Sequence, residues 1–234
     1  MENNYYAVSE RRDLSALLTN VMSRVYVCMF IGLLVTAAAA YWASSSETFM
    51  WMIFTDQKLF WGLIIAELVL VLVFSATVRK MSVAVSFICF IAYSLINGLT
   101  LSVVLWVYTE ASVFSAFLVA CLTFGLMSVI GHFTKKDLTS VGHYCMMGLI
   151  GVVLAGIINI FIMNDVFSFL VSAIGLLVFI GLTAYDTQTI KRWLAQETNA
   201  GNIRKITVWG ALTLYLDFIN IFLKLLRLTG KRRN

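Results

Sequence analysis

The chain of 234 residues is 61% hydrophobic and only 12% charged, whereas ordinary globular domains are roughly half apolar and roughly a quarter charged. A soluble fold of this length could not bury so much apolar surface, so the composition excludes a soluble domain, a disordered chain and a disulfide scaffold. The sequence also contains no proline. Together these features indicate an integral membrane protein whose helices are not interrupted by proline.

The net charge of +5 does not indicate a nucleic-acid-binding protein. Such a protein needs a contiguous basic surface, whereas the 17 Lys and Arg residues of this chain stand at the ends of apolar runs. The four cysteines fall in four different apolar runs, so packing is their expected role rather than a disulfide or a zinc site. We expect no cofactor and no nucleic acid as a partner.

Seven apolar runs are long enough to cross a bilayer, which predicts an all-α membrane protein with a seven-helix transmembrane bundle. The runs are 25–43, 59–78, 83–107, 113–131, 141–163, 166–186 and 206–226. We expect a cytoplasmic amino-terminal segment at 1–24, a transmembrane domain at 25–227 and a basic tail at 228–234. The joints are short, so the function must reside within the bilayer or at its surface.

The basic residues predict the orientation of the bundle. The amino-terminal segment and the second, fourth and sixth joints contain eleven Lys and Arg residues, whereas the first, third and fifth joints contain only Lys58. Cytoplasmic joints have the excess of positive charge, so the amino terminus and the even-numbered joints are expected in the cytoplasm. We therefore predict a multi-pass protein of the cell inner membrane.

The last run does not fit the charge rule, because an odd number of spans would export the basic residues that follow Asn220. Either the run at 206–226 spans the membrane and takes its tail across, or it is re-entrant and the tail stays in the cytoplasm. Its length and the usual dominance of the early helices favour a span.

Three acidic residues lie within the apolar runs, where a charge costs several kcal/mol. They are Glu67 in the second run, Asp186 at the end of the sixth and Asp217 in the middle of the seventh. Such residues are functional candidates by default, and the alternative is a protonated acid that is hydrogen-bonded to a neighbouring helix.

The seventh run also has a polar stripe. Thr213, Asp217, Asn220, Lys224 and Arg227 follow one another at alternating intervals of four and three residues, which places them on one face of a helix. This face cannot contact lipid, so we predict an interior helix that is wrapped by the others or lines water. Either the stripe, together with Glu67, marks a permeation pathway, or it is a structural polar seam.

Helix geometry tests which of these groups can meet. Asp217 lies about 16 Å inside the seventh run, and level, untilted helices leave an axial gap of roughly 10 Å between it and Asp186. Tilts of up to about 40° could close part of this gap. If the two aspartates do meet, like-charge repulsion makes them share a proton, which predicts a pH switch. Deprotonated, they form a hard oxygen site for calcium, and Arg79 at the end of the second run could pair with Asp186 as a latch.

Three stretches resemble the Bax inhibitor family of membrane proteins, the transmembrane Bax inhibitor motif family, including its bacterial members. They are YSLINGLTLSVVLWVYT at 93–109, GLTAYDTQ at 181–188 and GALTLYLDFINIFLKLLR at 210–227. The resemblance extends over all seven runs in order. It implies six helices around a central seventh.

The resemblance also implies a function, namely a pH-sensitive calcium leak gated by an aspartate pair. Asp186 and Asp217 match that pair by motif, and Arg79 resembles the latch residue of the family. The calcium and protons would then be the partners of the protein, together with the lipid bilayer. Some bacterial relatives are instead associated with modulating a membrane-bound protease, which implies a non-conducting regulator that binds a membrane partner.

An enzymatic function is not expected. An intramembrane aspartyl protease would match Tyr185 and Asp186, but the residues before Asp217 are not Gly-x-Gly and the proline-containing third motif of such enzymes is absent from a chain without proline. A retinal protein would need a lysine deep in the last run, whereas Lys224 stands near its end. The sequence therefore leaves the calcium leak as the leading hypothesis and the regulator as its alternative.

Overall fold

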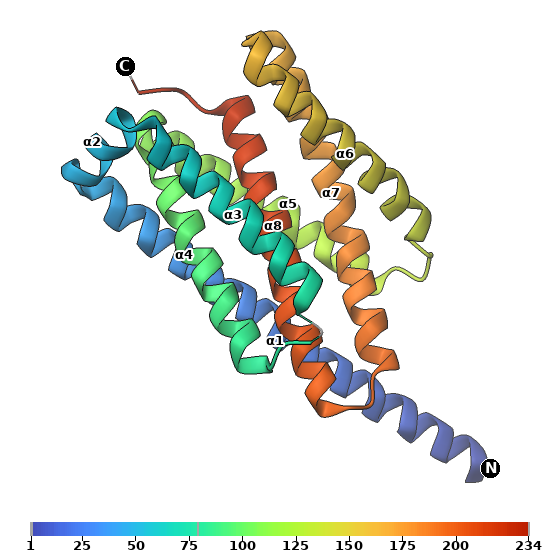
Figure 1. Cartoon of the computed structure of the whole chain (residues 1–234). Helices are drawn as coiled ribbons and strands as arrows, with labels where there is room; N and C mark the ends of the chain where they lie inside the picture. The colour runs from blue at the N-terminus through green and yellow to red at the C-terminus, as the bar shows by residue number, and fades with distance from the viewer. Residues whose placement is uncertain (1, 79, 234) are drawn as a thin grey trace.

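A computed structural model describes residues 2–78 and 80–233, and within them the side chains of 18–56, 58–78 and 80–233. This part of the chain forms eight helices joined by short connections (Figure 1). They are α1 (Glu2–Ser45), α2 (Glu47–Thr55), α3 (Gln57–Thr77), α4 (Val83–Val107), α5 (Glu110–Phe133), α6 (Thr139–Ile162), α7 (Asp165–Gln196) and α8 (Ala200–Thr229).

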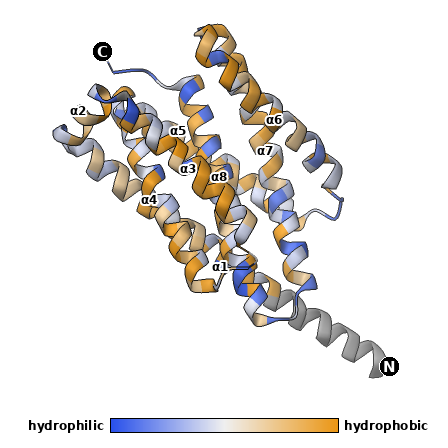
Figure 2. Cartoon of the chain, in the orientation of Figure 1, coloured by the Kyte–Doolittle hydropathy of each residue, from blue (hydrophilic) through white to orange (hydrophobic). Residues whose placement is uncertain are grey.

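Seven of these helices are long and apolar enough to cross a membrane, and α2 is the short one. The all-α transmembrane bundle predicted from the sequence is confirmed. Most helices begin where a polar side chain accepts a hydrogen bond from the first turn, as Ser82, Asn164 and Asn199 do for α4, α7 and α8. Figure 2 shows hydrophobic residues along the spans and hydrophilic residues gathered toward the joints and the carboxyl-terminal tail.

The last span is the centre of the bundle, as predicted. Helix α8 packs against α1, α4, α5 and α7, while α3 packs mainly on α4 and α6 mainly on α7. In its most apolar stretch 61% of the residues of α8 are buried, against 6% in α3 and in α6. Four helices therefore enclose α8 directly, and the other two spans form an outer layer.

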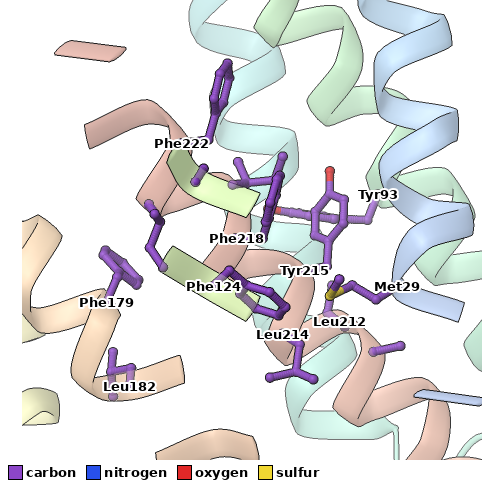
Figure 3. Packing of buried hydrophobic residues seen from close by; sticks show 14 of the residues in the cluster. Met29, Tyr93, Phe124, Phe179, Leu182, Leu212, Leu214, Tyr215, Phe218 and Phe222 are labelled. Atoms are coloured by element: carbon purple, nitrogen blue, oxygen red, sulfur yellow. The ribbon is translucent and has the colours of Figure 1, made fainter. Parts of the chain in front are cut away.

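Aromatic side chains fill the space around α8. Tyr215 meets the rings of Phe90 and Tyr93 edge to face, with ring centroids 5.7 and 5.9 Å apart. On another side, Phe124 of α5 lies 5.7 Å from Phe218 in the same geometry. Figure 3 shows Tyr93, Phe124, Tyr215 and Phe218 among these rings. Edge-to-face contacts of this kind stabilise a core by about 0.5–1.5 kcal/mol each beyond the area that they bury.

The carboxyl-terminal tail is fixed to the joint between α4 and α5. The backbone N–H of Thr109 donates to the carbonyl oxygen of Lys231 at 3.0 Å, and the N–H of Arg233 donates to that of Val107 at 2.8 Å. The Arg233 guanidinium also pairs with Glu110 at 3.2 Å. The tail therefore lies at the end of the bundle opposite the amino terminus (Figure 1).

Helix α8 crosses the whole bundle. Its 30 residues measure about 45 Å at 1.5 Å per residue, more than the hydrocarbon core of a bilayer. By length and composition α8 is therefore a seventh candidate span, as the sequence predicted. Of the basic residues after Asn220, Arg233 pairs with Glu110 at the end of the bundle where α8 finishes.

This topology predicts that the two chain ends lie on opposite sides of the membrane. A cysteine placed at Arg232, which is exposed, should react with a membrane-impermeant thiol reagent added outside intact cells, in a chain whose native cysteines are replaced. A cysteine at Lys136, in the exposed joint between α5 and α6, should react only after the cells are opened. Labelling of both positions from the same side would contradict the topology.

Candidate functional site

Asp186 of α7 and Asp217 of α8 meet inside the bundle. Their carboxyl groups lie close enough to interact directly. Asp217 is only 4% exposed, and its Oδ2 atom has no hydrogen-bond partner within the part of the chain that the structure describes. A carboxyl group donates a hydrogen bond only when it is protonated, so a hydrogen bond between the two groups would require one proton on the pair.

The end of α7 and the start of α8 are offset along the helix axes. The axial gap predicted from the sequence assumed that these ends are level. Ten residues of α7 follow Asp186 up to Gln196, whereas seventeen residues of α8, starting at Ala200, precede Asp217. This difference corresponds to about 10 Å at 1.5 Å per residue. The connection at 197–199 is extended at both ends and advances the chain by about 3.3 Å per residue before α8 turns back (Figure 1). The predicted axial gap was therefore wrong, because the helix ends are not level.

Two glycines position the segment of α7 that contains Asp186. Gly131 of α5 lies directly against the backbone carbonyl of Ala184, and Gly142 of α6 lies against the ring of Tyr185. A Cβ atom at either glycine would overlap these groups. The backbones of α5, α6 and α7 can therefore approach closely only because these two positions have no side chain.

A methyl group at Gly131 should disturb this packing. We expect Gly131→Ala to lower the unfolding free energy by about 1–3 kcal/mol, because the added atom meets backbone that cannot rotate away. Gly125→Ala in the same helix is the matched control, since a Cβ atom there meets nothing within 4 Å. Thermal unfolding of the purified variants in detergent measures both changes, and equal melting temperatures would refute the packing role of Gly131.

A cavity of about 840 Å³ opens at the end of the bundle where α7 passes into α8. It is lined by residues at the end of α3, by Val78 directly after that helix, and by residues of α7 and α8. Trp193 and Trp209 form one wall, with their ring centroids 4.7 Å apart, and Lys205 also lines the cavity.

Thr213 lines the inner part of this cavity, and Asp217 lies one helical turn, about 6 Å, further along α8. The hydroxyl group of Thr213 donates to the carbonyl oxygen of Trp209 at 3.1 Å, and the amide of Asn220 donates to that of Leu216 at 2.8 Å. These two members of the polar stripe therefore have donors paired within α8. The aspartate pair lies between them.

Solvent in the cavity should reach Thr213 but not its neighbour Leu212, which is 2% exposed. In a chain without native cysteines, Thr213→Cys should react with a small charged thiol reagent from the side of the α7–α8 connection. Leu212→Cys is the control and should stay unmodified. Mass spectrometry of the labelled protein measures the difference, and equal modification of the two positions would argue against the cavity.

Glu67 does not join the aspartate pair but forms a second polar group on another side of α8. Its Oε2 atom accepts a hydrogen bond from the amide of Asn97 at 3.4 Å, and the Tyr215 hydroxyl donates to the amide oxygen of Asn97 at 3.0 Å. The hydroxyl groups of Tyr215 and Thr36 are 2.7 Å apart, and that of Thr36 donates to the carbonyl oxygen of Ser94 at 2.9 Å. This polar chain connects α3, α4, α8 and α1.

The two polar groups use different faces of α8. Tyr215 and Asp217 are two residues apart, which corresponds to about 200° around a helix, so they point in nearly opposite directions. Asn97, Tyr215 and Thr36 were not among the sequence candidates. Asn97 and Tyr215 belong to the motif stretches at 93–109 and 210–227, so their position in those motifs was the available signal.

The latch hypothesis for Arg79 concerns a residue that lies outside the described part of the chain. Near the same end of the bundle, Asp137 pairs with Arg192 at 2.9 Å in the joint that precedes α6. The hydrogen bond from the Thr139 side chain, and next that from Arg192, lower the pKa of Asp137 to about 2. Asp137 therefore stays ionised near neutral pH and cannot act as a sensor there.

Among the side chains that the structure describes, no group of three or more His, Cys, Asp or Glu residues gathers to hold a metal ion. The aspartate pair offers two carboxyl groups, whereas calcium takes 6–8 oxygen ligands. A calcium ion at this pair would need most of its ligands from water or from backbone carbonyls.

Comparison with known proteins agrees with the arrangement of the spans. A family model described as "Inhibitor of apoptosis-promoting Bax1" matches residues 18–234. The chain belongs to this family. The Bax inhibitor resemblance drawn from the three motif stretches is therefore confirmed, and the match includes all seven spans.

Individual relatives of the Bax inhibitor family cover nearly the whole chain. The inner membrane protein YbhL of Escherichia coli K12 is 46% identical over 218 residues, which are 92% of this chain and 93% of the relative. A Borreliella burgdorferi protein is 39% identical over 91% of this chain and 92% of its own length. A Deinococcus radiodurans protein is 38% identical over 97% of this chain and 96% of its own length. The chain is therefore a multi-pass membrane protein of the Bax inhibitor family.

Proposed function

We propose that this protein is a pH-sensitive calcium leak of the inner membrane, gated by the Asp186–Asp217 carboxyl pair. The observation that favours this function most is the close approach of the two carboxyl groups inside the bundle, where Asp217 is buried. The family membership and the name of the Escherichia coli relative, an inner membrane protein, support the location. The amino terminus lies in the cytoplasm in this proposal, as the distribution of basic residues indicates.

The gate follows from electrostatics. While one proton is shared, the two carboxyl groups attract each other and hold α7 against α8. When this proton leaves, two negative charges face each other in a medium of low dielectric constant and repel strongly. The helices then separate, or a cation enters between the carboxylates. In this proposal Arg79 pairs with Asp186 in one of the two states.

The chemistry of the pair fits a transient calcium ligand. Carboxylate oxygens are the hard ligands that calcium prefers, but two carboxylates fill only part of its coordination shell. An ion that keeps most of its water is held loosely, and conduction requires binding weak enough for the ion to leave. Calcium is thus the permeating ion in this proposal and not a resident cofactor.

The surroundings of the pair supply a path toward it from one side. The cavity lined by Thr213 leads to within one helical turn of Asp217. Toward the other side, the polar stripe of α8 continues to Lys224, whose side chain packs against Gly175 of α7. A cation at this position opposes calcium, which is consistent with a slow leak rather than an open pore. Glu67 belongs to the polar group on a different face of α8, so in this proposal it lies off this path.

Calcium flux into proteoliposomes that contain the purified protein tests the proposal. Flux should rise as the pH increases from about 6 to about 8, because the shared proton is lost and the carboxylates repel. Asp186→Asn and Asp217→Asn should each abolish this pH dependence, since neither variant can have two negative charges. Asp137→Asn is the matched control and should keep it, because Asp137 is already ionised over this range.

Flux that is unaffected by pH and by both aspartate substitutions would refute the gate. The second candidate function is the regulation of a membrane-bound protease. It would be recognised by a stable complex between this protein and its membrane partner that still forms after both aspartate substitutions. A complex of this kind without any calcium flux would replace the leak by the non-conducting regulator. Neither candidate requires the protein to be an enzyme.

A further inference from the structure

A second cavity, of about 520 Å³, forms a groove at the other end of the bundle. It lies between α1 and α5, with α4 beside it and the central helix α8 as its floor. Its volume falls within the range of about 300–1,000 Å³ that is typical of small-molecule sites. The groove plays no part in the aspartate pair or in the cavity near Thr213.

The groove has apolar walls and faces the bilayer. Ala37 of α1 and Phe117 of α5 stand on opposite sides, and Phe222 of α8 lies at the bottom. At the rim, Tyr41 is 73% exposed and Phe114 is 65% exposed. Because both helices are membrane spans, these exposed apolar side chains contact lipid and not water. An occupant of the groove therefore enters sideways from the bilayer.

The mouth of the groove adjoins the basic carboxyl-terminal tail. Arg233 lines it and is held in place by the backbone pairing of the tail with the α4–α5 joint. Its guanidinium pairs with Glu110, and both side chains are largely exposed, so the pair is weak and open to a competing anion. Lys231 and Arg232 precede it and are both exposed at the same end. Three cations against one acid favour an anionic head group at this depth.

We propose that the groove binds one anionic phospholipid, with an acyl chain against Phe117 and Phe222 and the phosphate at Arg233. The apolar walls match the chain, and the basic tail at the membrane surface matches the phosphate. A guanidinium binds phosphate oxygens with two parallel hydrogen bonds, which makes Arg233 the specific contact. The proposal does not depend on calcium permeation.

The floor of the groove connects this lipid to the interior. Thr36 lines the groove, is 3% exposed, and lies with its hydroxyl group 2.7 Å from that of Tyr215. Tyr215 continues the polar chain to Asn97 and so to Glu67. The bound acyl chain therefore packs against the first member of the polar chain that connects α1 with α3.

Native mass spectrometry of the full-length protein tests the site. The protein is released from detergent in the presence of phosphatidylglycerol and phosphatidylethanolamine with identical acyl chains. We expect one phosphatidylglycerol to remain bound, with a several-fold preference over phosphatidylethanolamine. Arg233→Gln should remove most of this preference, whereas Arg232→Gln, which removes the same charge at a position that does not line the groove, should reduce it much less.

A second pair of variants tests the acyl-chain contact. Ala37→Trp should fill the groove and abolish retention of the lipid, and Ala37→Leu should weaken it. Ala38→Trp is the control, because Ala38 is exposed on the same helix but does not line the groove. Equal retention in Ala37→Trp and Ala38→Trp would refute the groove. An equal affinity for the two lipids in the unmodified protein would refute the anionic head group.

Discussion

The register between α7 and α8 is the constraint on which the candidate site depends. The extended connection at 197–199 starts α8 well beyond the end of α7, and this offset brings Asp217 level with Asp186. With level helix ends, each carboxyl group would face apolar side chains, at a cost of several kcal/mol for a charge. In the proposed gate, contact between the two groups removes this cost only while they share a proton. The offset between the helix ends would thereby make the interior sensitive to protonation.

Helix α8 combines this sensitivity with its position at the centre of the bundle. Its Asp217 face meets α7, and its Tyr215 face meets α1 and α4. A movement of α8 away from α7 therefore acts on both polar groups at once. The glycines at 131 and 142 limit where α7 can go, because they hold its backbone against α5 and α6. The pair is thus placed between a tightly packed side and a cavity.

The sequence was sufficient to predict the seven spans, the central last helix and the family, because hydrophobic length and local motifs determine these features. It also identified Asp186 and Asp217, together with Glu67, as the acidic residues within the apolar runs. The contact between these two residues could not be calculated from the sequence. Hydropathy ended the sixth span at Asp186, whereas α7 continues for ten more residues. Likewise, the pairing of the tail with the α4–α5 joint arises from backbone hydrogen bonds, which leave no pattern in the side chains.

The shared proton is the central claim, and infrared difference spectroscopy of the purified protein during a pH change observes it directly. The carbonyl stretch of a protonated carboxylic acid should disappear as the pH rises. Asp186→Asn and Asp217→Asn should each remove this signal, whereas Asp137→Asn should leave it intact. A protein that shows no pH-dependent carboxyl signal, or one that both aspartate variants retain, would contradict the proton-sharing pair.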